Sequence, residues 1–214
     1  MKLEGKKINF LGDSITYGVG ASSVDARFTK IIEREEKLGT MHNYGISGTR
    51  IARQHHVPSA NPAWDQDFCS RAADMDPDAD VVVVFGGTND YGHGDAPLGT
   101  PDDRTPDTFW GACHTLMRTL IEKYPTAVIV IMTPIHRAND THKNHAGVGL
   151  AGYVDILKKT ARFYGLPVLD LFAMGGIQPS IEAQKIAFCP DGLHPNDAGN
   201  RRIADRLIAF LRAY

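Results

Sequence analysis

The chain has 214 residues, of which 43% are hydrophobic and 22% charged, a composition normal for a soluble globular protein. Its net charge of −2 gives no general attraction for nucleic acid or for an anionic membrane. Cys69, Cys113 and Cys189 are an odd number of thiols, which fits a reducing compartment better than a disulfide framework. No apolar stretch of signal-peptide type precedes the first expected strand, so we expect a cytoplasmic protein.

Short β-branched runs bounded by glycine, proline or aspartate predict the strands. In chain order these runs are KINFLG at 7–12, MHNYG at 41–45, DVVVVFGG at 80–87, AVIVIMTP at 127–134 and LPVLDLF at 166–172. They are largely apolar without polar alternation, which is typical of parallel strands covered on both faces.

Segments with helical spacing of apolar residues lie between and after these runs. The predicted helices cover residues 26–38, 107–124, 149–164 and 196–214. Alternation of strands and helices predicts an α/β domain with a parallel sheet and helices on both faces. In such sheets the functional groups lie just past the carboxyl ends of the strands.

Asp13 and Ser14 directly follow the first predicted strand, in the sequence NFLGDSITYG. Taken alone, Gly-Asp-Ser is a weak signal, and capping of the next helical turn explains it better than catalysis does. A serine nucleophile needs a base, a group that orients the base, and donors for the developing oxyanion. Segments elsewhere in the chain contain residues of all three kinds.

The segment DGLHP, at 191–195, contains a carboxylate and an imidazole three residues apart. In a tight turn Asp191 can accept a hydrogen bond from one ring nitrogen of His194 while the other nitrogen faces Ser14. A turn cap at Asp191 and a surface position for His194 explain this segment equally well.

Two glycine-rich segments follow the second and third predicted strands. Asn89 of GGTND offers a neutral amide donor, although turn formation alone explains that segment. Gly45 and Gly48 of NYGISG each offer a backbone N–H to the same edge of the sheet. A hydroxyl, a glycine N–H, an amide and an Asp/His pair at one edge are together hard to attribute to turns alone.

These four segments resemble, in this order, the sequence blocks of the SGNH hydrolases, also called GDSL esterases and lipases. GDSITYG resembles the first block, NYGISG the second, GGTND the third and DGLHP the last. The resemblance implies a flavodoxin-like three-layer α/β/α sandwich with about five parallel strands, formed as a single domain over residues 1–214. It also implies a serine ester hydrolase that works through an acyl-enzyme and requires no cofactor or metal.

Position within the blocks implies a role for five residues. Ser14 would be the nucleophile, His194 the general base and then acid, and Asp191 the residue that orients the imidazole. The oxyanion hole would consist of the backbone N–H groups of Ser14 and Gly48 and the side chain of Asn89. Gly48 is preferred to the earlier glycine of its segment because it follows Ile-Ser, as the second-block glycine usually does.

Two long loops, 91–106 and 134–149, follow the third and fourth predicted strands and are expected to border the pocket and to select the substrate. Neither contains a long apolar lid, so we expect a small or polar acyl ester, such as an acetylated sugar, rather than a bulky lipid. His136, His142 and His145 suggest a metal site, but loop histidines without paired carboxylates or cysteines more often face solvent.

Two other functions are compatible with the same fold. A flavodoxin-like module without catalysis would bind a phosphate or nucleotide at this edge, although GxxxxGK[ST] and a GxGxxG after the first strand are both absent from the sequence. An acyltransferase would form the same acyl-enzyme and pass the acyl group to an alcohol. The partner expected of the esterase is a small-molecule ester, with neither nucleic acid nor membrane.

Overall fold

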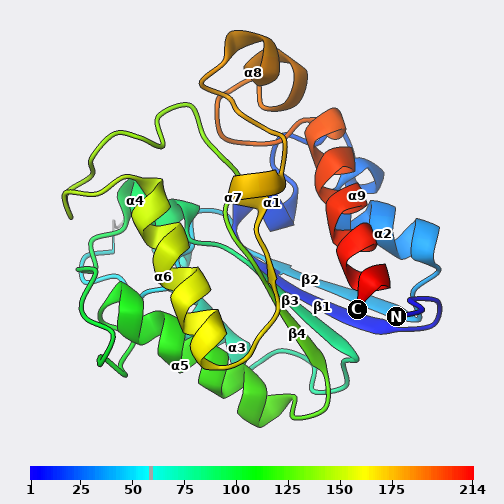
Figure 1. Ribbon diagram of the computed structural model, residues 1–214, viewed down its shortest axis with the longest axis horizontal. Helices are drawn as coiled ribbons and strands as arrows, with labels where there is room; N and C mark the ends of the chain where they lie inside the picture. The colour runs from blue at the N-terminus through cyan, green and yellow to red at the C-terminus, as the bar shows by residue number, and fades with distance from the viewer. Residues whose placement is uncertain (58–59) are drawn as a thin grey trace.

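Five parallel strands form the central sheet of the computed structural model, which describes residues 1–57 and 60–214 (Figure 1). The strands are β1 (Lys7–Gly12), β2 (Thr40–Gly45), β3 (Val81–Phe85), β4 (Val128–Met132) and β5 (Val168–Leu169). They lie in the order β2-β1-β3-β4-β5, and all neighbouring pairs run parallel. The chain passes from β1 to β2 on one side and later places β3 on the other, so β1 ends at the switch point of the sheet.

Helices cover both faces of the sheet (Figure 1). One face is covered by α2 (Phe28–Glu36) and α9 (Asp197–Ala213), and the other by α3 (Phe68–Ala72), α5 (Phe109–Lys123) and α6 (Leu150–Phe163). Shorter helical segments lie in the connections: α1 (Ser14–Tyr17), α4 (Thr88–His93), α7 (Leu171–Met174), α8 (Glu182–Phe188), and the 3-10 turns Val24–Ala26 and Pro62–Asp65. None of the helices in the described residues is long and apolar enough to span a bilayer.

The predicted α/β fold with a parallel sheet of about five strands is confirmed. Alternate residues of β3 enter the two cores, with Val82 and Val84 on the side of α5 and Val81 and Val83 on the side of α9. Because both faces are buried, the strand needs no polar alternation. This is why an uninterrupted run of valines in the sequence predicts a buried strand.

The fifth strand is shorter than the predicted run 166–172, since only Val168–Leu169 pairs with β4. The chain leaves the sheet at Asp170, whose carboxylate accepts a hydrogen bond from the backbone N–H of Ala173 and so caps α7. A capping aspartate therefore ends a strand that apolar content alone would have extended.

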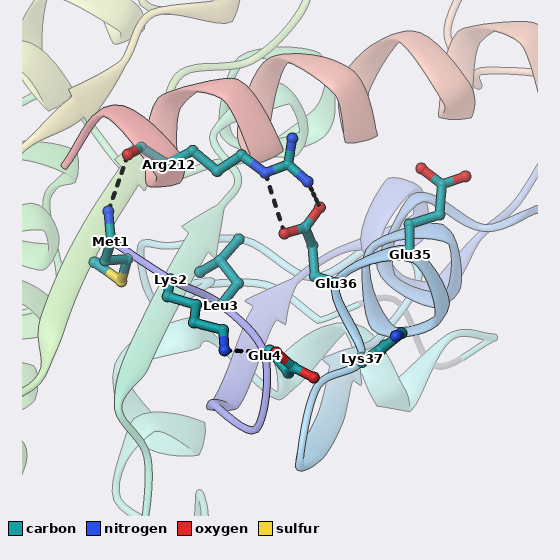
Figure 2. Close-up of a pocket in the computed structure, with 8 residues that line it drawn as sticks. All are labelled: Met1, Lys2, Leu3, Glu4, Glu35, Glu36, Lys37 and Arg212. Atoms are coloured by element: carbon teal, nitrogen blue, oxygen red, sulfur yellow. Dashed lines mark hydrogen bonds and ion pairs between the residues drawn. The ribbon is translucent and has the colours of Figure 1, made fainter.

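The two chain ends meet on the face covered by α2 and α9. The terminal ammonium of Met1 donates hydrogen bonds, each at 3.0 Å, to the backbone carbonyl of Leu211 and to that of Arg212, the second of which Figure 2 shows. The guanidinium of Arg212 also donates to the carboxylate of Glu36 at the end of α2, at 2.7 Å (Figure 2). Cations at the last turn of α9 complement the helix dipole, and these contacts fix this end of the helix to the start of the chain and to α2.

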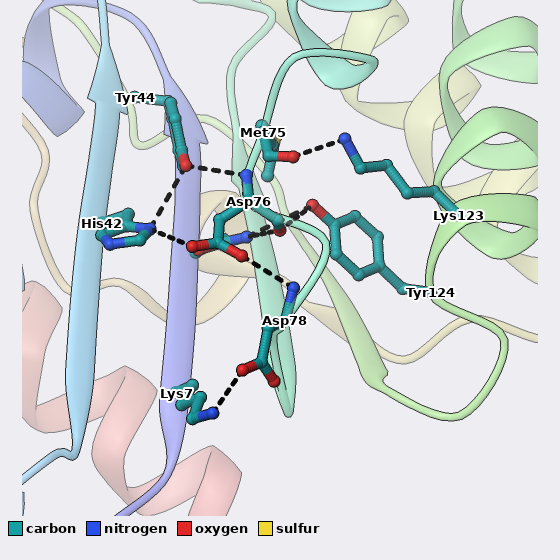
Figure 3. Close-up of polar contacts among 9 residues, drawn as sticks. Lys7, His42, Tyr44, Met75, Asp76, Asp78, Lys123 and Tyr124 are labelled. Atoms are coloured by element: carbon teal, nitrogen blue, oxygen red, sulfur yellow. Dashed lines mark hydrogen bonds and ion pairs between the residues drawn. The ribbon is translucent and has the colours of Figure 1, made fainter.

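A polar network fixes the segment before β3 to β1, β2 and α5. The carbonyl oxygen of Asp76 accepts hydrogen bonds from the amide of Asn9, at 2.8 Å, and from the hydroxyl of Tyr124, at 2.7 Å. The backbone N–H of Asp76 donates to the hydroxyl of Tyr44, at 2.9 Å, and His42 lies beside the Asp76 carboxylate (Figure 3). Asn9 is a buried amide within β1, so this network is part of the sheet's support.

Replacement of Asn9 by alanine is expected to lower the free energy of unfolding by about 1–3 kcal/mol, because the buried partners of its amide lose hydrogen bonds. Urea denaturation measures the change. Thr40→Ala, at the exposed start of β2, is the control and should stay within about 0.5 kcal/mol of the parent. Equal stability of the two variants would contradict a structural role for the Asn9 amide.

Candidate active site

Ser14 begins α1 immediately past the carboxyl end of β1. The carboxylate of Asp13 accepts a hydrogen bond from the backbone N–H of Ile15, at 2.9 Å, and caps this short helix. The hydroxyl of Ser14 instead lies 3.0 Å from Nε2 of His194. The capping interpretation of Gly-Asp-Ser is therefore right for Asp13, while the Ser14 side chain faces an imidazole from the other end of the chain.

Asp191 and His194 share one turn before α9. Oδ1 of Asp191 accepts hydrogen bonds from the backbone N–H groups of Leu193, at 2.9 Å, and of His194, at 2.7 Å, while Oδ2 lies 2.6 Å from Nδ1 of His194. Partial burial raises the pKa of Asp191, but these donors outweigh it and hold the pKa below its ordinary value. With an ionised carboxylate at Nδ1, Nε2 is left to accept a hydrogen bond from Ser14.

Contacts between distant segments hold this turn beside α1. Asn200 of α9 is fully buried, accepts a hydrogen bond from the backbone N–H of Phe28 at 3.0 Å, and donates to the carbonyl oxygen of Pro195 at 2.8 Å. The loop after α1 approaches Pro195 closely at Gly20. A Cβ at this glycine would lie 2.6 Å from the Pro195 carbonyl oxygen and 3.2 Å from the Cβ of His194, so a larger residue would not fit. The imidazole is therefore positioned by buried backbone contacts on both sides.

Gly48 and Asn89 line the same cavity as Ser14 and His194, and its volume is about 340 Å³. The buried amide of Asn89 donates a hydrogen bond to the carbonyl oxygen of Thr49, at 3.0 Å, which leaves its second N–H for another acceptor. Within the described part of the chain, the backbone N–H groups of Ser14 and Gly48 donate no hydrogen bond. These two backbone N–H groups and the second N–H of Asn89 therefore have no acceptor among the described residues.

The two glycines of the NYGISG segment have different surroundings. Gly45 ends β2, and its backbone N–H donates to the side chain of Asn43 at 2.9 Å, so this donor is already engaged. Gly48 has a φ of +79°, which favours glycine, and a Cβ there would lie 2.0 Å from Nε1 of Trp64. The structure therefore places Gly48, and not Gly45, at the cavity.

Several lining residues were not identified from the sequence: Val19, Ser47, Trp64, His93, Arg137 and Leu193. The rings of Trp64 and His93 stack with centroids 4.3 Å apart. Arg50 donates to the backbone carbonyls of both residues, at 3.3 and 3.1 Å. Burial and the positive charge of Arg50 lower the pKa of His93 to about 4, so this ring is neutral near pH 7.

The two long loops meet the cavity in part. Arg137 lies in the predicted loop 134–149. His93 falls within the predicted loop 91–106, but it is the last residue of α4, so the start of that segment is helical. Trp64 comes from the 3-10 turn Pro62–Asp65, which no sequence pattern predicted. Of the three loop histidines, His142 and His145 are exposed and His136 pairs with the carboxylate of Asp140. No group of three or more histidine, cysteine, aspartate or glutamate side chains in the described residues is arranged to hold a metal ion.

Comparison with known proteins identifies the family. The family model for the GDSL-like Lipase/Acylhydrolase family matches residues 10–202, and the chain therefore belongs to this family. The chain is 33% identical in sequence to the protein of one crystal structure, and the TM-score between the two structures is 0.86. The match covers 100% of this chain and 99% of the other chain. The chain is also 31% identical to a protein from Lactobacillus plantarum whose crystal structure is known, with a TM-score of 0.86. That match covers 99% of this chain and 98% of the other chain.

A more distant solved structure is that of an acetyl xylan esterase. The two proteins are 21% identical in sequence, and their TM-score is 0.68. The match covers 95% of this chain and 98% of the esterase chain, and it shows that the two have a similar fold. None of the curated proteins compared with the chain matches it. The family and the fold together define a hydrolase.

Two buried carboxyl groups, Asp13 and Asp90, directly neighbour Ser14 and Asn89 in the sequence. Burial raises the pKa of Asp13 to about 7, even though the N–H of Ile15 stabilises its ionised form. Burial also raises the pKa of Asp90 to about 6, although its carboxylate accepts hydrogen bonds from the backbone N–H groups of Ile51 and Ala52, at 3.0 and 2.9 Å. For both groups the folded protein favours the protonated acid more than the unfolded chain does, so their contribution to stability falls as the pH rises.

Asp13→Asn is expected to gain stability over the parent as the pH rises from about 4 to 7. The parent must ionise a buried acid over this interval and the amide does not, so the difference in unfolding free energy should grow by at most about 4 kcal/mol. Asparagine also caps helices well, so the cap on α1 is kept. Denaturation at several pH values measures the slope, with Asp74→Asn at an exposed position as control. A difference that does not change with pH would contradict this account of Asp13.

Proposed function

We propose that the protein is a carboxylic ester hydrolase that forms an acyl-enzyme on Ser14. The observation that carries the proposal is the line of hydrogen-bonding groups from the Ser14 hydroxyl to Nε2 of His194, at 3.0 Å, and from Nδ1 of His194 to the carboxylate of Asp191, at 2.6 Å. A hydroxyl, a base and a group that orients the base are what nucleophilic catalysis by serine requires.

The first half of the reaction is acylation. His194 accepts the hydroxyl proton through Nε2 as Oγ of Ser14 bonds to the ester carbonyl carbon, and Asp191 stabilises the imidazolium that results. When the tetrahedral intermediate collapses, the bond to the alcohol oxygen breaks and His194 returns the proton to the leaving alcohol. His194 then takes a proton from a water molecule that attacks the acyl carbon. The bond from that carbon to Oγ of Ser14 breaks, His194 returns the proton to Oγ, and the acid is released.

The negative charge on the carbonyl oxygen needs donors that are already in place. We assign this task to the backbone N–H groups of Ser14 and Gly48 and to the free amide N–H of Asn89, since all three residues line the cavity. The bond from Asn89 to the carbonyl of Thr49 keeps its amide from turning away. Such preorganised donors stabilise the transition state without reorganising at the moment of reaction.

We infer that the substrate is a small or polar acyl ester, with an acetylated carbohydrate as the leading candidate. A cavity of about 340 Å³ suits a short acyl group better than a long chain, and Trp64 provides an aromatic ring at its wall. The acetyl xylan esterase with the same fold supports this choice by analogy. An acyltransferase would use the same groups, and products formed with an added alcohol acceptor would distinguish the two.

Ser14→Ala is expected to lower kcat/KM for an aryl acetate by about 10³-fold or more, because the reaction loses its nucleophile. Ser180→Ala, at an exposed position before α8, is the control and should keep the parent rate. A fluorophosphonate probe should label the parent at Ser14 and leave the Ser14→Ala variant unlabelled. A parent rate in Ser14→Ala would refute the proposed nucleophile.

A series of p-nitrophenyl esters tests the size of the acyl group. Acetate and butyrate are expected to be hydrolysed faster than esters of long-chain acids, because the cavity accommodates a short chain. The measurement is kcat/KM for each ester at a concentration below its micelle-forming limit. Faster turnover of the long-chain esters would contradict the proposed substrate class.

A further inference from the structure

Arg137 brings a positive charge to the wall of the cavity that contains Ser14. Its Nε donates a hydrogen bond to the side chain of Asn139, at 2.9 Å, and its Nη1 donates to the carbonyl oxygen of Thr88, at 3.2 Å. Within the described part of the chain, Nη2 donates no hydrogen bond and the guanidinium forms no ion pair with a carboxylate. The same Nη1 also lies 3.5 Å from the hydroxyl oxygen of Thr88. All of these acceptors are neutral, so among the described residues no carboxylate balances the charge.

The guanidinium occupies a space that α4 provides for it. A Cβ at Gly92 would lie 2.5 Å from Nη1, so a side chain at this position would displace the charged group. The guanidinium carbon lies 5.4 Å from the centroid of the Tyr91 ring, within the range of a cation–π contact. The hydroxyl of Tyr91 also hydrogen-bonds to the backbone carbonyl of Asn139, which fixes the loop that carries the arginine. The position of the charge is therefore built into the fold.

The same loop is attached to the turn that holds the imidazole. The backbone N–H of Ala138, next to Arg137, donates to the carbonyl oxygen of Gly192 at 2.8 Å, and Gly192 follows Asp191. The side chain of Arg137 meanwhile reaches Thr88, next to Asn89. The arginine thus lies between the two segments that supply the proposed oxyanion donor and the proposed base.

Other charged groups nearby do not neutralise Arg137. The closest acidic side chain of its own loop, Asp140, is paired with His136, and Asp191 is paired with His194. Partial burial lowers the pKa of Arg137, and the negative charges of Asp140, Asp13 and Asp191 oppose this effect only in part. His93 lines the same cavity and is neutral near pH 7, so it adds no charge beside Arg137.

We propose that Arg137 binds a carboxylate carried by the substrate, so that the enzyme prefers esters with an anionic group near the reacting carbonyl. A poorly solvated guanidinium gains most from an anionic acceptor, because charge-assisted hydrogen bonds are stronger than neutral ones. An acetylated acidic sugar would combine this group with a short acyl chain. The inference rests on the proposed esterase function, which it makes more specific.

Two matched pairs of substrates test the preference and locate the anionic group. 4-Nitrophenyl hemiglutarate carries a carboxylate on the acyl side and is compared with its neutral methyl ester by release of nitrophenol. 3-Acetoxybenzoate carries it on the alcohol side and is compared with methyl 3-acetoxybenzoate by release of the phenol. In at least one pair, kcat/KM for the anionic ester should exceed that for the neutral ester.

Arg137→Gln is expected to lower the ratio of anionic to neutral kcat/KM in that pair by roughly 10- to 100-fold, the range for a hydrogen bond to a charged group. Most of the loss should be a rise in KM for the anionic ester. Arg137→Lys, which keeps the charge, should retain a ratio between those of the parent and Arg137→Gln. Arg118→Gln, at an exposed position of α5, makes the same change in net charge and should keep the parent ratio.

The outcomes separate this inference from the proposed function. A parent enzyme that hydrolyses both members of each pair equally well would overturn the role of Arg137 and leave the esterase proposal intact. An equal loss for the anionic and neutral esters in Arg137→Gln would also overturn it, because a merely structural arginine affects both alike. A parent that hydrolyses none of the esters and is not labelled at Ser14 would overturn both proposals.

Discussion

The attachment of the start of α9 to the end of β1 is the constraint on which the rest of the site depends. The hydroxyl of Ser14 and Nε2 of His194 come from positions 180 residues apart and lie 3.0 Å from each other. Asn200 maintains this arrangement from within the core, since one buried amide bonds both to the start of α2 and to the carbonyl of Pro195. The pairing of Met1 and Glu36 with the last turn of α9 fixes the other end of the same helix.

The order of the strands explains why so many separate segments reach one place. β1 lies between β2 and β3, so the loops after these three strands start from neighbouring positions at the same edge of the sheet. Glycines allow these loops to approach closely, as Gly48 does against the indole of Trp64 and Gly20 does against the turn of His194. A sheet of parallel strands thus gathers groups that are remote in sequence, and small residues determine how near they come.

Burial gives chemically identical side chains different states in this region. Asp13, next to Ser14, is buried, and burial raises its pKa to about 7, whereas Asp191 lies in a partly exposed turn whose N–H donors keep its pKa low. The first residue supports α1 and the second suits the stabilisation of an imidazolium. Arg137 is the positive counterpart, a partly buried guanidinium with neutral protein acceptors on one side and the cavity on the other. The proposed chemistry depends on the N–H donors that hold the charge of Asp191, and the proposed preference for an anionic ester depends on a partly buried guanidinium whose protein acceptors are neutral.

The sequence by itself determined the order of strands and helices, because apolar runs and helical periodicity are local properties that each segment carries alone. It also marked Ser14, Gly48, Asn89, Asp191 and His194 as candidate site residues, because short segments beside the strand ends and the last helix resemble the blocks of the SGNH hydrolases. Only the tertiary structure decided that Trp64 and Arg137 border the cavity, and that Asp170 ends the fifth strand early. Those outcomes depend on contacts between segments far apart in the chain, such as Arg137 in the space above Gly92, and no local pattern of residues encodes such a contact.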